Sequence, residues 1–171
     1  MQINLESKVA IVTGVSGDGQ VGQTLAKALA ESGAQLAICA RKQNNVEARA
    51  KELRDAGARV FAMVGSLTDE GQVQRLIEGT VSDYGRIDIL VNLAGGLSRY
   101  KPAIEHSLDD WHAEVDNNLL SAFLTSRAAF PLCKRSGTVS SSTLPGLASL
   151  RNALECNAYC DHAREAAKAA E

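Results

Sequence analysis

Four glycines near the start of the chain have the spacing of a turn that binds an anion. A helical pattern follows the apolar run 8–13, after a turn that contains Gly14, Gly17, Gly19 and Gly22. Glycine lets the main chain come close to a ligand because it has no Cβ atom. The free N–H groups of a first helical turn and the positive end of the helix dipole favour a phosphate. The order of strand, glycine turn and helix therefore predicts a site for the pyrophosphate of a dinucleotide, with an ordinary strand-to-helix turn as the alternative.

A pair of cations follows the next strand pattern. Arg41 and Lys42 come directly after Ala40, at a place where an acidic side chain would bind the ribose hydroxyls of NAD. Positively charged side chains at that place suit the 2′-phosphate of NADP instead. The sequence therefore favours NADP as the cofactor and keeps NAD open, with a solvated basic loop as the alternative for the two residues.

Strand and helix patterns alternate along the first half of the chain. Four apolar runs predict strands, at 9–13, 36–40, 59–64 and 87–91. Three helical patterns lie between them, at 21–32, 46–55 and 68–84. Continuous apolar runs are typical of strands that are buried on both faces of a parallel sheet. We expect one α/β domain over residues 1–171, a Rossmann-like, doubly wound parallel sheet in a three-layer α/β/α arrangement.

The last part of the chain departs from this alternation. A helical pattern runs from 107 to 132, and the strand pattern after it, at 138–139, is very short. From about residue 136 the segment is atypical, with a serine run at 140–142. We expect a sheet that is incomplete at its C-terminal end, since no further pattern supplies a sixth strand. An open edge beside the fifth strand favours association of copies, so we also expect a homo-oligomer.

The glycine turn, the segment Asn92-Leu93-Ala94-Gly95, Asn118, the serine run at 140–142 and Tyr159 follow one another in this order. In these motifs the chain resembles the short-chain dehydrogenase/reductase family, strongly from about residue 5 to residue 131 and loosely afterwards. The turn at 13–22 is similar to the family's glycine-rich turn, although it is two residues longer. The segment 92–95, Asn-Leu-Ala-Gly, is similar to the family's N-N-A-G motif. Asn118 lies where the family has a helix asparagine, and the serine run and Tyr159 lie where it has its active-site serine and tyrosine.

The resemblance implies hydride transfer between a nicotinamide cofactor and a small-molecule carbonyl or alcohol substrate. In this family a tyrosine phenol donates the proton, a serine orients the carbonyl, and an asparagine supports the proton path. The expected catalytic residues are Asn118, Ser142 and Tyr159. The expected cofactor-binding residues are Gly14, Gly17, Gly19, Val21, Gly22, Arg41, Ser66, Leu67, Asn92, Ala94 and Gly95.

One position departs from the family's active-site pattern. The family has a lysine one helical turn after the tyrosine, where its charge lowers the pKa of the phenol, and this chain has Ala163 there. His162 is the nearest basic side chain that could share a helix face with Tyr159. Ser141 and Ser142 both stay candidates for the active-site serine. Two hypotheses follow: an NADP(H)-dependent oxidoreductase, or a non-catalytic remnant that binds a dinucleotide or acts as a scaffold.

Composition and charge argue against other classes of protein. A net charge of −2 predicts no nucleic-acid partner. No apolar run approaches the roughly 18 residues of a membrane span, so no membrane partner is expected. The N-terminus lacks the pattern of a signal peptide, and a cytoplasmic location is expected. Cys156, Cys160 and His162 match no common zinc spacing, so we expect no metal site.

Overall fold

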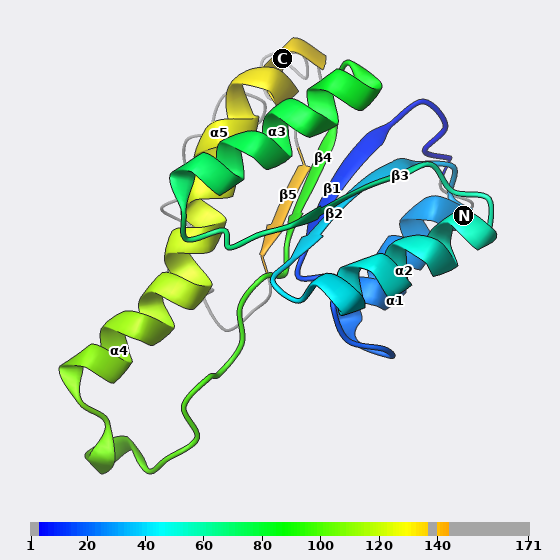
Figure 1. Ribbon diagram of the computed structural model, residues 1–171. Helices are drawn as coiled ribbons and strands as arrows, with labels where there is room; N and C mark the ends of the chain where they lie inside the picture. Colours follow the sequence, from blue (N-terminus) through cyan, green and yellow to red (C-terminus); the bar gives the residue numbers. More distant parts are fainter. Residues whose placement is uncertain (1–3, 137–139, 144–171) are drawn as a thin grey trace, which may run out of the picture.

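Five parallel strands form the central sheet of the computed structural model, which describes residues 4–136 and 140–143 (Figure 1). The strands are β1 (Val9–Thr13), β2 (Gln35–Ala40), β3 (Val60–Val64), β4 (Ile89–Asn92) and β5 (Ser140–Thr143). They pair in the order β3-β2-β1-β4-β5, which is the start of the 3-2-1-4-5-6 order of a doubly wound sheet. The four strands predicted from apolar runs are confirmed, with small shifts at their ends.

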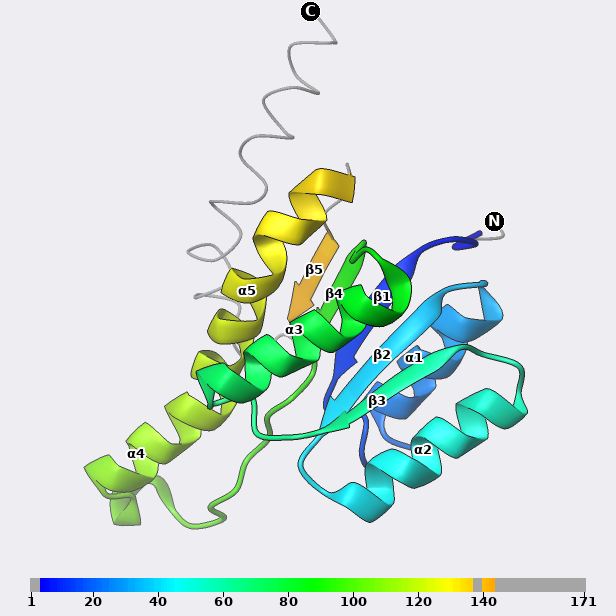
Figure 2. The ribbon, with the colours of Figure 1, turned by 45° about the horizontal axis from the view of Figure 1, so that its top comes forward.

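Helices cover both faces of this sheet. The α-helices are α1 (Val21–Glu31), α2 (Gln43–Asp55), α3 (Glu70–Tyr84), α4 (Leu108–Val115) and α5 (Ser121–Ser136). Two short elements complete the order, the 3-10 turn η1 (Ala103–Glu105) and the π-helical turn η2 (Asp116–Leu120). Figures 1 and 2 show α1 and α2 on one face of the sheet and α3 and α5 on the other. The predicted three-layer α/β/α fold is therefore confirmed.

Strand β1 lies at the centre, and all of its side chains are buried. Ala10 and Val12 belong to the apolar cluster on the side of α1 and α2. Ile11, between them, belongs to the cluster on the side of α3 and α5. Successive side chains of a strand point to opposite faces, so a strand with two covered faces must be apolar at every position. This requirement is the physical reason for the unbroken run that predicted the strand.

The boundaries of α3 also follow from its sequence. Asp69 precedes the helix, and its carboxylate accepts a hydrogen bond of 2.8 Å from the main-chain N–H of Gln72. Such a cap satisfies one of the donors that the first helical turn leaves free. Gly85 ends the helix in the left-handed conformation, with φ of 77°, which glycine adopts without steric cost.

One prediction about the segment after β4 is wrong in detail. The single long helix predicted for 107–132 is divided by the π-helical turn η2 into α4 and α5. Strand β5 occupies the serine run at 140–143, and the short pattern predicted at 138–139 lies outside the described residues. Strand β5 pairs with β4 residue by residue, with Ser142 opposite Val91. Strand β5 has no apolar pattern of its own, and its main-chain hydrogen bonds to β4 stabilise it.

In residues 4–136 and 140–143, no helix combines the length and the apolar character that crossing a membrane requires. The same part of the chain contains no cluster of three acidic, histidine or cysteine side chains that could hold a metal ion. Cys39 and Cys133 are buried free thiols. Cys156, Cys160 and His162 lie outside the described residues.

Candidate functional site

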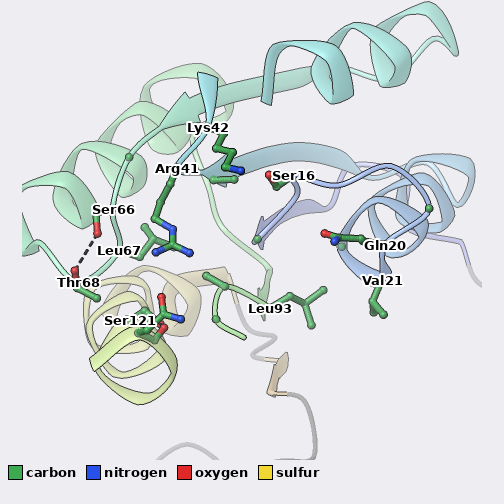
Figure 3. A pocket seen from close by; sticks show the side chains of 18 residues that line it. Ser16, Gln20, Val21, Arg41, Lys42, Ser66, Leu67, Thr68, Leu93 and Ser121 are labelled. Atoms are coloured by element: carbon green, nitrogen blue, oxygen red, sulfur yellow. Dashed lines mark hydrogen bonds between the residues drawn. The ribbon is translucent and has the colours of Figure 1, made fainter. Parts of the chain in front are cut away.

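A cavity of about 570 Å³ opens at the carboxyl ends of the strands (Figure 3). The chain segments that follow β1, β2, β3 and β4 all contribute to its wall. This is the edge of a doubly wound sheet at which ligands bind. Most residues predicted to bind a cofactor line it, namely Gly14, Gly19, Val21, Gly22, Arg41, Ser66, Leu67, Ala94 and Gly95.

Two glycines let three main-chain segments meet at the floor of the cavity. Gly14 has a φ of +77°, and a Cβ atom on it would lie 2.6 Å from the carbonyl oxygen of Leu93. A Cβ atom on Gly22, at the start of α1, would lie 2.7 Å from the carbonyl oxygen of Gly14. Real Cβ atoms do not approach an oxygen this closely. The end of β1, the start of α1 and the segment after β4 are therefore held together at positions that only glycine can occupy without rearrangement.

The hydroxyl group of Thr13 fixes the segment after β4. Its Oγ1 atom accepts hydrogen bonds of 3.0 Å from the main-chain N–H groups of both Leu93 and Ala94. The Thr13 side chain is fully buried at the end of β1. The predicted segment 92–95 is thus joined to the glycine turn by a side chain whose removal would leave two donors without partners.

The start of α1 offers free hydrogen-bond donors to the cavity. Gln20 occupies the N-cap position, and its side chain makes no capping hydrogen bond to the helix. The first turn of α1 contains no acidic residue. The helix dipole and the first N–H groups are therefore available for an anion. A pyrophosphate group fits this cradle of glycine main chain and helix N-terminus.

Two cations line the cavity between the glycine turn and the turn after β3 (Figure 3). Arg41 and Lys42 follow β2, line the cavity and are exposed. No side chain in the described part of the chain forms an ion pair with either of them. Arg49, farther along α2, is instead paired with Asp18 at 3.1 Å and with Glu52 at 2.6 Å. Arg41 and Lys42 therefore keep their charge for a ligand, whereas that of Arg49 is balanced within the protein.

The acidic residue of the glycine turn, Asp18, has its charge balanced by a neighbouring cation. A hydrogen bond with Gln23 and the positive charge of Arg49 lower the pKa of Asp18 below its usual range. Asp18 is thus ionised at neutral pH, and its charge is balanced by the ion pair with Arg49. Ser16 is held from α2 as well, since Asn45 donates a hydrogen bond of 3.0 Å to its hydroxyl group.

The turn after β3 closes the far side of the cavity. Figure 3 shows Ser66, Leu67 and Thr68 there, away from Gln20 and Val21 at the other end. The hydroxyl groups of Ser66 and Thr68 lie 2.9 Å apart and share a hydrogen bond. Leu67 is buried and supplies an apolar surface. A polar rim beside an apolar wall suits a flat aromatic ring such as a nucleobase.

Two predicted asparagines have structural partners and do not line the cavity. Asn92 is buried, and its Oδ1 atom accepts a hydrogen bond of 2.7 Å from the hydroxyl group of Thr125. Asn118 lies in the π-helical turn η2. Its Oδ1 atom accepts a hydrogen bond of 2.8 Å from the N–H of Gly96, and its Nδ2 atom donates one of 2.8 Å to the carbonyl oxygen of Glu114. Asn118 therefore holds the loop that follows the predicted segment 92–95.

The remaining predicted residues are placed less directly. Ser142 lies in β5 beside Val91 of β4, one residue before the end of the strand. Gly17 lies in the glycine turn next to the cavity wall, under the side chain of Gln20. Tyr159 and Ala163 lie outside the described residues.

Several residues of the cavity wall were not predicted, among them Ser16, Gln20, Thr68, Asn117 and Ser121. Asn117 and Ser121 reach the wall from the π-helical turn and the start of α5. The two adjacent asparagines at 117 and 118 are the sequence signal that could have indicated an irregular helix there, since asparagine favours helix ends over interiors.

The geometry of the site agrees with the comparisons to known proteins. The family model for short chain dehydrogenases matches residues 8–143. This chain belongs to the short-chain dehydrogenase family. It is 34% identical over 148 residues to a tropinone reductase homolog of Arabidopsis thaliana, which covers 86% of this chain and 54% of that protein. It is 40% identical over 126 residues to D-threitol dehydrogenase of Mycolicibacterium smegmatis, covering 72% of this chain and 46% of that protein.

Two solved reductases have a similar fold. The L-sorbose reductase of Gluconobacter frateurii, in complex with NADPH and L-sorbose, has a TM-score of 0.75 and 26% identity, covering 82% of this chain and 53% of that one. A 3-ketoacyl-ACP reductase of Sinorhizobium meliloti has a TM-score of 0.73 and 28% identity, covering 78% of this chain and 51% of that one. This short-chain dehydrogenase chain spans about half the length of the curated relatives it matches.

Proposed function

We propose that this chain binds NADP(H) and serves hydride transfer between that cofactor and a small-molecule carbonyl or alcohol. The observation that carries the proposal is the cavity at the strand ends, which is lined by the glycine turn and by two cations that no described side chain pairs. A pyrophosphate group and a 2′-phosphate are the two anionic parts of NADP. The cavity offers a separate and suitable partner for each of them.

The choice of NADP rests on Arg41 and Lys42. A guanidinium group binds a phosphate with two parallel hydrogen bonds, which gives strength and direction. Both residues line the cavity, and no described side chain neutralises them. The L-sorbose reductase of similar fold was solved with NADPH, which supports the same cofactor here.

The catalytic roles are proposed on the residues that match the family's motif. When bound, the nicotinamide supplies or accepts the hydride. Tyr159 would donate the proton to the carbonyl oxygen, and Ser142 would hold that oxygen. Asn118 would act by holding the loop at Gly96, to which it is hydrogen bonded. Ala163 stands in place of the lysine that lowers the pKa of the phenol in the family. We therefore expect alcohol oxidation, in which the phenolate accepts the proton, to rise with pH toward the ordinary tyrosine pKa of about 10.

An activity assay tests this function. Reduction of a panel of aldehydes and ketones is followed by NADPH absorbance, with the Tyr159→Phe variant as the comparison. The proposal predicts turnover in the wild type and a loss of at least about tenfold without the phenol. NADPH binding without any turnover would instead favour the second hypothesis, a non-catalytic remnant, which the alanine at 163 supports.

Removal of one cation tests the choice of cofactor. In the Arg41→Ala variant we expect the Kd for NADPH to rise about 10- to 100-fold, because a hydrogen bond to a charged group is lost. The Kd for NADH should change little, because NADH has no 2′-phosphate. Arg59→Ala, on the loop between α2 and β3, is the control for the loss of one positive charge. Equal effects of Arg41→Ala on both cofactors would contradict the preference for NADP.

We also propose that the protein is a homo-oligomer in the cytoplasm. Large apolar side chains are exposed around α4, among them Ile104 at 94%, Leu108 at 77% and Trp111 at 63%, and an exposed apolar surface of this kind favours association. The buried free thiols of Cys39 and Cys133 suit a reducing compartment. Light scattering of the purified chain tests the first proposal, and a monomer at micromolar concentration would contradict it.

A further inference from the structure

Two glutamine side chains occupy main-chain donors of the glycine turn. The carboxamide oxygen of Gln20 accepts a hydrogen bond of 3.1 Å from the N–H of Gly17. The carboxamide oxygen of Gln23 accepts one of 2.6 Å from the N–H of Gly19. Two N–H groups of the turn that faces the cavity are therefore already engaged by side chains.

The two glutamines are held very differently. Gln23 is only 3% exposed, and its Nε2 atom donates a hydrogen bond of 2.7 Å to Glu52 on α2. Glu52 is in turn paired with Arg49, and Arg49 with Asp18 of the turn. Gln23 is thus one member of a buried network that joins the turn to α2.

Gln20, in contrast, lies on the surface of the cavity. It is exposed and lines the cavity wall, and Figure 3 shows its carboxamide beside the glycine turn. The carboxamide lies flat against Gly17, because a Cβ atom on that glycine would be 2.2 Å from its Cδ atom. Its hydrogen bond to Gly17 is the one that its side chain forms within the described part of the chain. Rotation about its side-chain bonds is therefore enough to release the Gly17 N–H.

We propose that Gln20 occupies, in the free protein, the hydrogen-bonding position that a phosphate oxygen takes when the dinucleotide binds. The inference rests on the proposed function and assigns Gly17 as a donor to the cofactor. One N–H group cannot donate fully to both acceptors, and a bond to a charged phosphate is the stronger of the two. Gln20 must therefore turn away on binding, while Gln23 keeps the Gly19 N–H engaged in both states.

This competition lowers the apparent affinity for the cofactor. Only the fraction of molecules with Gln20 turned away is ready to bind. The apparent Kd is therefore the intrinsic Kd divided by that fraction. A neutral hydrogen bond of ordinary net strength changes the apparent Kd by a factor of about 2 to 10. The Gln20→Ala variant should therefore bind NADPH about 2- to 10-fold more tightly than the wild type.

Calorimetric titration of the full chain with NADPH tests the prediction. Gln74→Ala is the matched control, since Gln74 is an exposed glutamine of α3 that bonds to Glu78 at 2.9 Å, away from the cavity. The proposal predicts tighter binding for Gln20→Ala and no change for Gln74→Ala. If the wild type binds NADPH and Gln20→Ala binds equally or more weakly, the role of Gln20 is refuted while the proposed function stands. If the wild type and both variants fail to bind, the proposed function itself fails.

Amide resonances provide a second readout that needs no variant. In a titration of the ¹⁵N-labelled wild type with NADPH, the Gly17 amide should shift strongly because its acceptor changes from a neutral to a charged oxygen. The Gly19 amide should shift much less, because Gln23 remains its partner. A larger shift for Gly19 than for Gly17 would overturn the assignment of the two glutamines.

Discussion

The replacement of Gly22 by alanine sets two effects of known size against each other. Gly22 is the second residue of α1, and alanine in a helix is more favourable than glycine by up to about 1 kcal/mol. Its added Cβ atom would lie 2.7 Å from the carbonyl oxygen of Gly14 and 3.2 Å from its carbonyl carbon. These atoms belong to the main chain, so the turn itself must move. Such overpacking costs about 1–3 kcal/mol, and the net loss in the free energy of unfolding is about 0–2 kcal/mol.

Gly71 provides the matched control for this prediction. It is the second residue of α3, and a Cβ atom on it would meet only the Asp69 carboxylate, at 3.3 Å. Gly71→Ala should keep most of the stabilisation that alanine gives a helix relative to glycine. The free energies of unfolding of the two variants, measured in urea, should therefore differ by about 1–3 kcal/mol. Gly22→Ala should also bind NADPH at least about tenfold more weakly, because the moved turn loses a hydrogen bond to a charged group. Equal stability of the two variants, with unchanged NADPH binding, would refute the close approach at Gly14.

Other substitutions test the supports of the site. Thr13→Val should lower the free energy of unfolding by about 2–4 kcal/mol, because it leaves two main-chain donors unsatisfied. Thr13→Ser keeps the hydroxyl group and should lower it by only about 1 kcal/mol. Urea unfolding compares the two variants, and similar losses would contradict the role of the hydroxyl group. Asp88 is buried beside Arg86, Lys8 and the N–H of Val9. Burial raises the pKa of Asp88, but hydrogen bonds from Arg86 and Val9 and the charge of Lys8 outweigh it, so the pKa lies below 3.8. The stability contributed by this carboxylate is therefore present above the ordinary carboxyl pKa and is lost as the pH falls through its lowered value. The stability difference between wild type and Asp88→Asn should be full at pH 7 and shrink below pH 4, and a difference that grows on acidification would contradict the assignment.

The fold could be predicted because its strands carry their own signal. An unbroken apolar run such as 9–13 is what a strand covered on both faces requires, and the structure places it at the centre of the sheet. Strand β5 has no such signal, because its sequence is a serine run and its conformation depends on pairing with β4. The π-helical turn at 116–120 was missed for a similar reason. Its Asn118 bonds to Gly96, a contact distant in the sequence that no local pattern reveals.

Some residues of the candidate site could likewise be predicted from the sequence, and others could not. Glycines 14 and 22 and the cation Arg41 were predicted, because their chemistry is specific to a position between a strand and a helix. Gln20 and Thr68 were not predicted, since each is an ordinary polar residue whose place in the wall follows only from how the turns approach one another. Sequence motifs therefore identify the groups that bind charge, while the three-dimensional arrangement shows which groups compete with the ligand or support it.

The most direct test of the account is a calorimetric titration of the folded full chain with NADPH, followed by thermal unfolding at a saturating concentration. The glycine turn and the cations at 41 and 42 predict saturable heat with one site per chain. At a concentration one hundred times the Kd, binding stabilises the folded state by about 2.7 kcal/mol, which raises the melting temperature by about 5–10 °C. Absence of both heat and a melting shift at millimolar NADPH, in a sample shown to be folded by circular dichroism, would contradict the dinucleotide site.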